Sequence, residues 1–175
     1  ALGIILAAII VGCHRTSPPS GNAPPVLQAE LKAFFAAKER QARALVAQEK
    51  KEMAPEVWPF FAAGSKGDWK TVADLYSKMA PRSYQFNFSS LPCDDRLTSM
   101  VWQTINESYR AYEVFAFGDP KHMQMFGQEI LVSIPPGSIY FGDTAPGRFI
   151  VTFLRTSHEG GNAFFTVTQN PLSDR

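Results

Sequence analysis

The chain has 175 residues, of which 45% are hydrophobic, and its formal net charge is +1. So small a net charge, with no basic stripe to neutralise phosphates, argues against nucleic-acid binding. Two cysteines are too few for a disulfide scaffold, so the fold must depend on a hydrophobic core.

The chain opens with an apolar run that ends at a cysteine. Residues 1–11 carry no polar side chain, and the run closes with Ile10-Val11-Gly12-Cys13. A helix of this length measures about 16 Å, roughly half of a ~30 Å hydrocarbon core, which suits a signal segment better than a transmembrane helix. No Met and no basic residue precede the run, so we expect the chain to be truncated at this end. Residues 13–26 are rich in proline and poor in apolar residues, which predicts an extended tether of about 40 Å.

The pattern Ile10-Val11-Gly12-Cys13 resembles the signal of bacterial lipoproteins. This resemblance implies that residues 1–12 are cleaved and that the Cys13 sulfur carries a diacylglyceryl group. It places the protein in the bacterial cell envelope, attached to a membrane and facing the periplasm or the exterior. Two alternatives stay open: a buried N-terminal helix that ends at Cys13, and a disulfide between Cys13 and Cys93.

Residues 27–133 are predicted to be helical. Apolar residues recur at helical spacing, and Pro, Gly and Asp mark the ends of the segments. The expected helices cover 27–53, 55–65, 69–79, a stretch from the Asp94-Asp95 pair to about 117, and 119–133. Residues 55–79 look like a helix pair of the tetratricopeptide type, with its aromatic side chains in the core. Alternation over 83–88 indicates a short strand or extended arm.

Residues 134–175 change character and predict the start of an α/β unit. The pattern indicates a strand at 138–141, a loop at 142–147, a helix at 148–156 and a strand at 163–168. Strand, helix and strand in this order make a parallel, right-handed βαβ unit. The predicted fold class is therefore α+β or α/β with a mainly helical first part. Two strands make only a marginal sheet, so we expect further chain after Arg175 or completion by another subunit.

The loop and first helical turn at 142–148 form the candidate ligand site, with Asp143, Thr144, Gly147 and Arg148 as the candidate residues. Ligands bind at the carboxyl ends of strands in open α/β sheets, and helix N-termini attract anions. Arg148 is unfavourable against the helix dipole unless an anion or a carboxylate offsets it. Helix capping and a tight turn explain the same residues without any ligand, and the sequence is neither a Walker loop nor a dinucleotide fingerprint.

The stretch from Ile134 to Asp143 is similar to a strand and loop in the soluble part of bacterial membrane glycosyltransferase-like proteins of unknown function. Residues 55–175 as a whole look like uncharacterised secreted or lipid-anchored bacterial proteins. These resemblances imply a family of folds and no particular activity.

No catalytic residue can be assigned from the sequence, and neither a cofactor nor a metal is expected. His122, His158 and Cys93 lack the spacing of metal ligands. Our leading hypothesis is a non-catalytic binding or scaffolding lipoprotein, anchored to a membrane and using its helical surface for a protein partner. The alternative is an envelope enzyme or ligand-binding domain that acts on a sugar- or phosphate-bearing substrate through residues 142–148.

Overall fold

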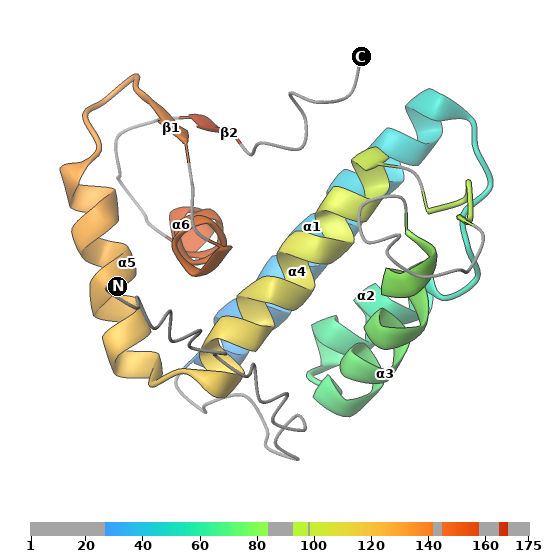
Figure 1. Ribbon diagram of the computed structural model, residues 1–175, viewed down its shortest axis with the longest axis horizontal. Coiled ribbons are helices and arrows are strands. Elements are labelled where there is room, and N and C mark those ends of the chain that lie inside the picture. Colours follow the sequence, from blue (N-terminus) through green and yellow to red (C-terminus); the bar gives the residue numbers. More distant parts are fainter. Residues whose placement is uncertain (1–26, 84–92, 98, 142–144, 158–164, 168–175) are drawn as a thin grey trace, which may run out of the picture.

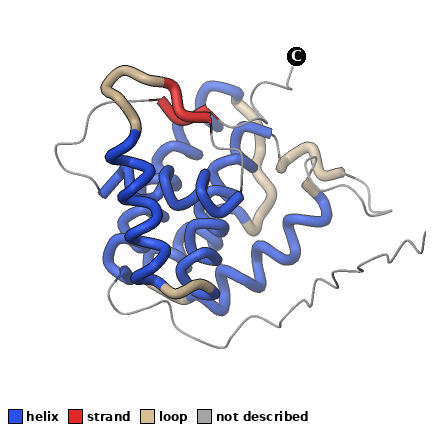
Figure 2. Tube along the Cα trace, turned by 60° about the vertical axis from the view of Figure 1, so that its left-hand side comes forward, coloured by secondary structure: helices blue, strands red, loops and turns tan. Residues whose placement is uncertain are grey.

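The structure is a computed structural model that describes residues 27–83, 93–97, 99–141, 145–157 and 165–167. These residues are mainly helical, with two short strands (Figure 2). In chain order the elements are α1 (Gln28–Glu49), α2 (Val57–Lys66), α3 (Trp69–Met79), η2 (Ala80–Arg82), α4 (Ser99–Phe117), α5 (Pro120–Ser133), β1 (Ile139–Phe141), α6 (Ala145–Ser157) and β2 (Phe165–Val167).

The two longest helices, α1 and α4, lie side by side through the middle of the molecule (Figure 1). The α2–α3 hairpin packs on one flank of this pair. Helix α6 packs on the other flank, and α5 covers α6 from outside. One hydrophobic core runs through all of these layers and includes residues of each of the six α-helices.

Aromatic side chains hold the layers together through α1. Phe35 lies 5.4 Å from Phe60 of α2 and 5.8 Å from Trp69 of α3, measured between ring centroids. Its neighbour Phe34 meets Phe153 of α6 edge to face at 5.4 Å. Successive helical residues differ by about 100° in direction, so one turn of α1 serves both flanks.

Several predicted helix ends are confirmed, with the expected physical cause. Helix α3 begins after Asp68, whose side chain accepts a hydrogen bond from the Thr71 backbone N–H at 3.2 Å. The turn before it uses Gly67 at φ 82°, a conformation that favours glycine. Asp119 caps α5 by accepting from the backbone N–H groups of Lys121 and His122.

Other predicted boundaries are wrong. Helix α1 ends at Glu49, not at Met53, because Lys50 turns the chain with a positive φ of 52°. Helix α4 begins at Ser99 and is not capped by the Asp94-Asp95 pair. The Asp94 side chain instead accepts from the backbone and guanidinium of Arg96 in a turn before the helix.

The candidate ligand segment also differs from its prediction, because α6 begins at Ala145. Gly147 therefore lies in the first turn of this helix and not in the predicted loop. Arg148 lies in the first helical turn, as predicted, although the helix begins before it. Pro146 is the second residue of α6, and proline in a first turn is a start signal that the sequence already contained.

Strands β1 and β2 pair in parallel, with Ile139 opposite Phe165 and Phe141 opposite Val167. Each strand has three residues, and α6 lies between them in the chain. Helix α6 packs mainly against α5 and α4, so helix packing and not a broad sheet organises this part of the molecule. The expected strand or arm at 83–88 falls, after Ser83, outside the described residues.

None of the helices in the described residues combines the length and the apolar character that crossing a bilayer requires.

Candidate functional site

The predicted ligand residues are only partly within the described chain. Asp143 and Thr144 lie outside the described residues, as does the proposed lipidation site Cys13. Gly147 is buried in the first turn of α6, and Arg148 is partly buried beside it. Of the four candidates, the structure therefore places only Gly147 and Arg148 together.

Arg148 is held in an environment that disfavours its charge. Its guanidinium carbon lies 4.5 Å from the centre of the Phe149 ring, and its Nε is buried without a hydrogen-bond partner. Burial lowers the pKa of Arg148; the negative charge of Glu107 opposes this shift and the positive charge of Arg110 adds to it. Arg148 is thus turned toward the α4 side of α6 and is incompletely satisfied there.

Glu107 on α4 is the acidic group that balances this region. It forms an ion pair with Lys38 of α1, and both side chains are only about one-tenth exposed, at 11% and 12%. Gln103 donates a further hydrogen bond to Glu107 Oε1 at 2.9 Å. The carboxylate is therefore occupied by partners from two helices, as expected of a structural ion pair rather than of a free acid or base.

A second polar group on α4, the Asn106 side chain, faces the α2–α3 hairpin. The Tyr76 hydroxyl donates to Asn106 Oδ1 at 2.9 Å, and the Tyr76 and Tyr109 rings stack at 3.7 Å. Burial is the main cause that raises the pKa of Tyr109 to about 12, and it also raises the pKa of Tyr76. Both phenols therefore stay protonated at physiological pH, and within the molecule they serve in packing and hydrogen bonding.

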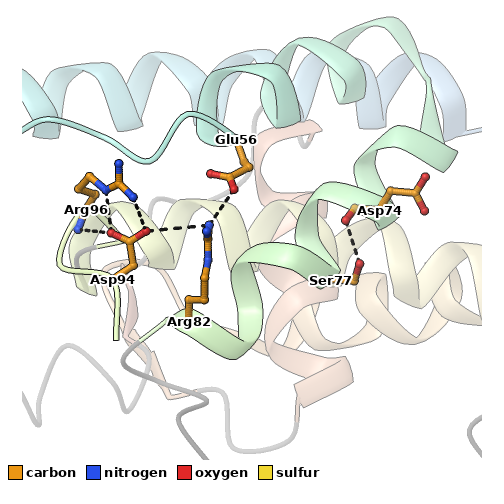
Figure 3. Close-up of polar contacts among 6 residues, drawn as sticks. All are labelled: Glu56, Asp74, Ser77, Arg82, Asp94 and Arg96. Atoms are coloured by element: carbon orange, nitrogen blue, oxygen red, sulfur yellow. Dashed lines mark hydrogen bonds and ion pairs between the residues drawn. The ribbon is translucent and has the colours of Figure 1, made fainter. Parts of the chain in front are cut away.

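An ion-pair network joins the segments that flank residues 84–92 (Figure 3). Arg82 Nη2 donates to Glu56 Oε1 at 2.9 Å and lies 4.0 Å from Asp94 Oδ2. Asp94 also accepts from Arg96 Nε at 2.9 Å, and its backbone N–H donates to Arg82 O at 2.9 Å. The hydrogen bond from Arg96 holds the pKa of Asp94 below its usual value, and the charge of Arg82 adds to the effect. The network holds the two flanking segments together, and two of its atoms, Glu56 Oε2 and Arg82 Nε, are buried without a hydrogen-bond partner.

Metal binding finds no support in the part of the chain that the structure describes. Within it, no three His, Cys, Asp or Glu side chains come together as a metal site would require. His122 is exposed at the start of α5 and pairs with Asp119 at 3.2 Å.

The surface that sequence reasoning missed is the outward side of α5. We define the α5 outer face by five side chains, His122, Met125, Phe126, Glu129 and Val132, all of which are exposed. Met125 is 52% exposed, Phe126 45% and Val132 81%. The opposite side of α5 packs on α6, since a Cβ at Gly127 would overlap Ile150 and Leu154. The signal was present in the sequence, because apolar residues of α5 fall on two different sides of the helix, with Leu131 on one and Met125 and Val132 on the other.

Three comparisons with known proteins were made, against family models, curated proteins and solved structures, and none found a match to this chain. The interpretation of its function therefore rests on its own residues.

The Asp94 network predicts a pH-dependent contribution to stability. The pKa of Asp94 is lower in the folded state than the usual value of about 3.9, so its ionised form stabilises the fold above that pH. We expect Asp94→Asn to lower the free energy of unfolding by about 0.5–1 kcal/mol at pH 7. Urea unfolding of both proteins at pH 7 and below pH 4 measures this difference. It should be present at pH 7 and vanish as the pH falls through the pKa that Asp94 has in the folded state.

Asp74→Asn is the matched control, because Asp74 pairs with Lys70 on the exposed side of α3. It should change the stability less at pH 7. A deficit of Asp94→Asn that stays the same at every pH would contradict the role given to the ionised carboxylate.

Proposed function

We propose that this chain is a lipid-anchored protein of the bacterial cell envelope that binds a partner protein and catalyses no reaction itself. The observation that carries the binding role is the α5 outer face, where Met125, Phe126 and Val132 are exposed together on one helix. Large apolar side chains gathered on one surface mark interaction sites far more often than single ones do. The polar groups inside the molecule support the same view, since Glu107 and Asp94 are both held in ion pairs.

The anchor is supported by the sequence Ile10-Val11-Gly12-Cys13 and by the proline-rich residues that follow. A tether of about 40 Å holds a domain near a membrane and leaves its surfaces free to meet other envelope proteins. Confinement to a membrane raises the effective concentration of neighbouring partners, so a modest binding face is sufficient there.

We expect Cys13→Ser to release the protein from the membrane fraction of the bacterium that produces it. Mass spectrometry of the unsubstituted protein should find a diacylglyceryl group on the Cys13 sulfur and no residues before it. Cys93→Ser is the control and should leave the protein in the membrane fraction. An unmodified Cys13 that still carries residues 1–12 would contradict the anchor.

The binding role predicts a partner contact at α5. A benzophenone amino acid in place of Phe126 should form one defined cross-linked product on irradiation of intact cells. The same group in place of Met100, which is 47% exposed on α4, should not form this product. Val132→Asp should abolish it, because a charge in the α5 outer face disfavours apolar contact.

The absence of a Val132-dependent product at position 126 would overturn the binding role of α5. Thermal unfolding of each variant serves as the folding control, since the substituted side chains are exposed and should hardly change stability.

A second candidate function is the binding of a sugar- or phosphate-bearing ligand at the start of α6. The observation in its favour is Arg148, whose buried Nε lacks a hydrogen-bond partner and whose pKa is lowered by burial. An anion at the N-terminus of α6 would supply an acceptor and offset the desolvated charge. Asp143, Thr144 and Gly147 are the neighbouring residues that would complete such a site.

This candidate predicts that inorganic phosphate, sugar phosphates or nucleotides raise the melting temperature of the protein. Arg148→Ala should abolish the increase, whereas Arg155→Ala, an exposed arginine in the last turn of α6, should preserve it. No increase with any of these anions would remove the candidate.

The finer fold assignment is also part of the proposal. We propose that β1, α6 and β2 form a βαβ unit of the α/β type and that α2 and α3 pack as a tetratricopeptide-like pair. Support for the first comes from the parallel register of Ile139 with Phe165. Support for the second comes from the short turn at Gly67, which joins α2 to α3, and from the packing of these two helices on each other.

A further inference from the structure

The α5 outer face follows the spacing of a helix-pairing seam. His122, Met125, Glu129 and Val132 are three, four and three residues apart, so they line up along one side of the helix, and Phe126 flanks them. Gly127 and Leu131 occupy the opposite side and are buried against the rest of the molecule. Within the described residues, the α5 outer face is thus directed away from the core.

Two exposed side chains of opposite charge lie on or beside this face. Lys121 lies in the first turn of α5, and Glu129 lies about two turns later, about 12 Å along the axis. Asp119, just before the helix, accepts from the first backbone N–H groups and pairs with His122, so it acts as the cap of the helix. The helix dipole has the same polarity, positive at the first turn and negative at the last.

Such a face complements itself when two copies meet with their α5 helices antiparallel. Parallel helices would bring like charges and like dipole ends together, whereas antiparallel helices bring unlike ones together. A two-fold axis beside Met125 and Phe126 places the Met125 of each copy against the Phe126 of the other. The same axis brings His122 opposite Glu129, and one patch then serves both copies, as in most symmetric dimers.

We propose that the partner of the α5 outer face is a second copy of this chain, bound with α5 antiparallel to α5. This inference rests on the proposed function, which assigns the face to protein binding, and it names the partner. Helix α5 has 14 residues and is about 21 Å long, so the contact is small and the dimer weak in solution. Anchoring of both copies to one membrane would strengthen it through effective concentration.

Cysteine cross-linking tests both the contact and its direction. The full chain carries Cys13→Ser and Cys93→Ser, so that each introduced cysteine is the only one. Met125→Cys lies next to the two-fold axis and should form a disulfide-linked dimer under mild oxidation. Val132→Cys should not, because its two Cα atoms would be about 20 Å apart, beyond the ~7 Å reach of a disulfide. Met100→Cys, an exposed methionine of α4, is the matched control and should stay monomeric.

Equal cross-linking at Met125→Cys and Val132→Cys would indicate parallel helices and overturn the proposed arrangement. Cross-linking at Met125→Cys no greater than at Met100→Cys would overturn the dimer itself.

Charge reversal supplies an independent measurement by sedimentation velocity of the full chain. Glu129→Lys should weaken the dimer about fivefold, because in the antiparallel pair residue 129 of one copy lies near Lys121 of the other, and adding Lys121→Glu should restore it. Lys70→Glu on exposed α3 should have no effect. Equal weakening by Lys70→Glu, or no rescue by Lys121→Glu, would overturn the pairing of charges.

The cross-linking in cells separates this inference from the proposed function. A Phe126 product with twice the mass of the chain supports the dimer. A product containing a different protein leaves the binding role intact and overturns the dimer. The dimer is also overturned if Met125→Asp, in the chain that carries Cys13→Ser, abolishes binding to phosphatidylethanolamine–phosphatidylglycerol vesicles without changing the sedimentation, since the face then contacts lipid.

Discussion

The arrangement of the helices depends on two neighbouring phenylalanines in the second turn of α1. Phe35 is buried against the α2–α3 hairpin and Phe34 against Phe153 of α6. Burial of a phenylalanine side chain contributes on the order of 2 kcal/mol, so this one turn anchors both flanks of the molecule. Gly64 allows α2 to approach closely enough, because any Cβ there would overlap the Phe35 ring. The outward position of α5 follows, since α6 fills the flank on which Phe34 lies.

Polar side chains inside the helix bundle fix the positions of α1, α3 and α4. Glu107 binds Lys38 across the α1–α4 contact, and Asn106 accepts from Tyr76 across the α3–α4 contact. Each pair is satisfied only in one register of the two helices, because a shift would leave a buried polar group without its partner. Apolar contacts tolerate such shifts better, so these pairs favour a single packing arrangement.

Local sequence signals predicted most of the helices and fewer of their ends. Helix α3 matches its predicted limits, because Asp68 and Gly67 act within a single turn. The end of α1 was missed because Lys50 adopts a positive φ, which its residue type does not signal. The start of α4 was missed because the Asp94 carboxylate binds Arg96 instead of capping the helix. These choices depend on tertiary contacts that composition and spacing do not contain.

At the candidate site, too, the sequence identified an unusual residue but not its surroundings. Arg148 was recognised as an unusual residue in a first helical turn, but its relation to Glu107 depends on how α6 packs beside α4. The ligand site was expected at a strand end, whereas the exposed apolar residues lie on α5, for which the sequence predicted a helix and no site. Periodicity indicates that a helix is amphipathic, and it does not indicate which of several apolar sides remains uncovered.

The backbone hydrogen bond from Asp94 to Arg82 has a consequence for how this protein tolerates change in length. This bond holds together the chain before and after residues 84–92. The ion pairs of Arg82 with Glu56 and of Asp94 with Arg96 support it. These contacts, and not the number of residues between Arg82 and Asp94, therefore set the distance from α3 to α4. Lengthening an enclosed segment costs little, since closure entropy grows only with the logarithm of its length. An insertion within residues 84–92 would therefore leave the contacts among Glu56, Arg82, Asp94 and Arg96 in place.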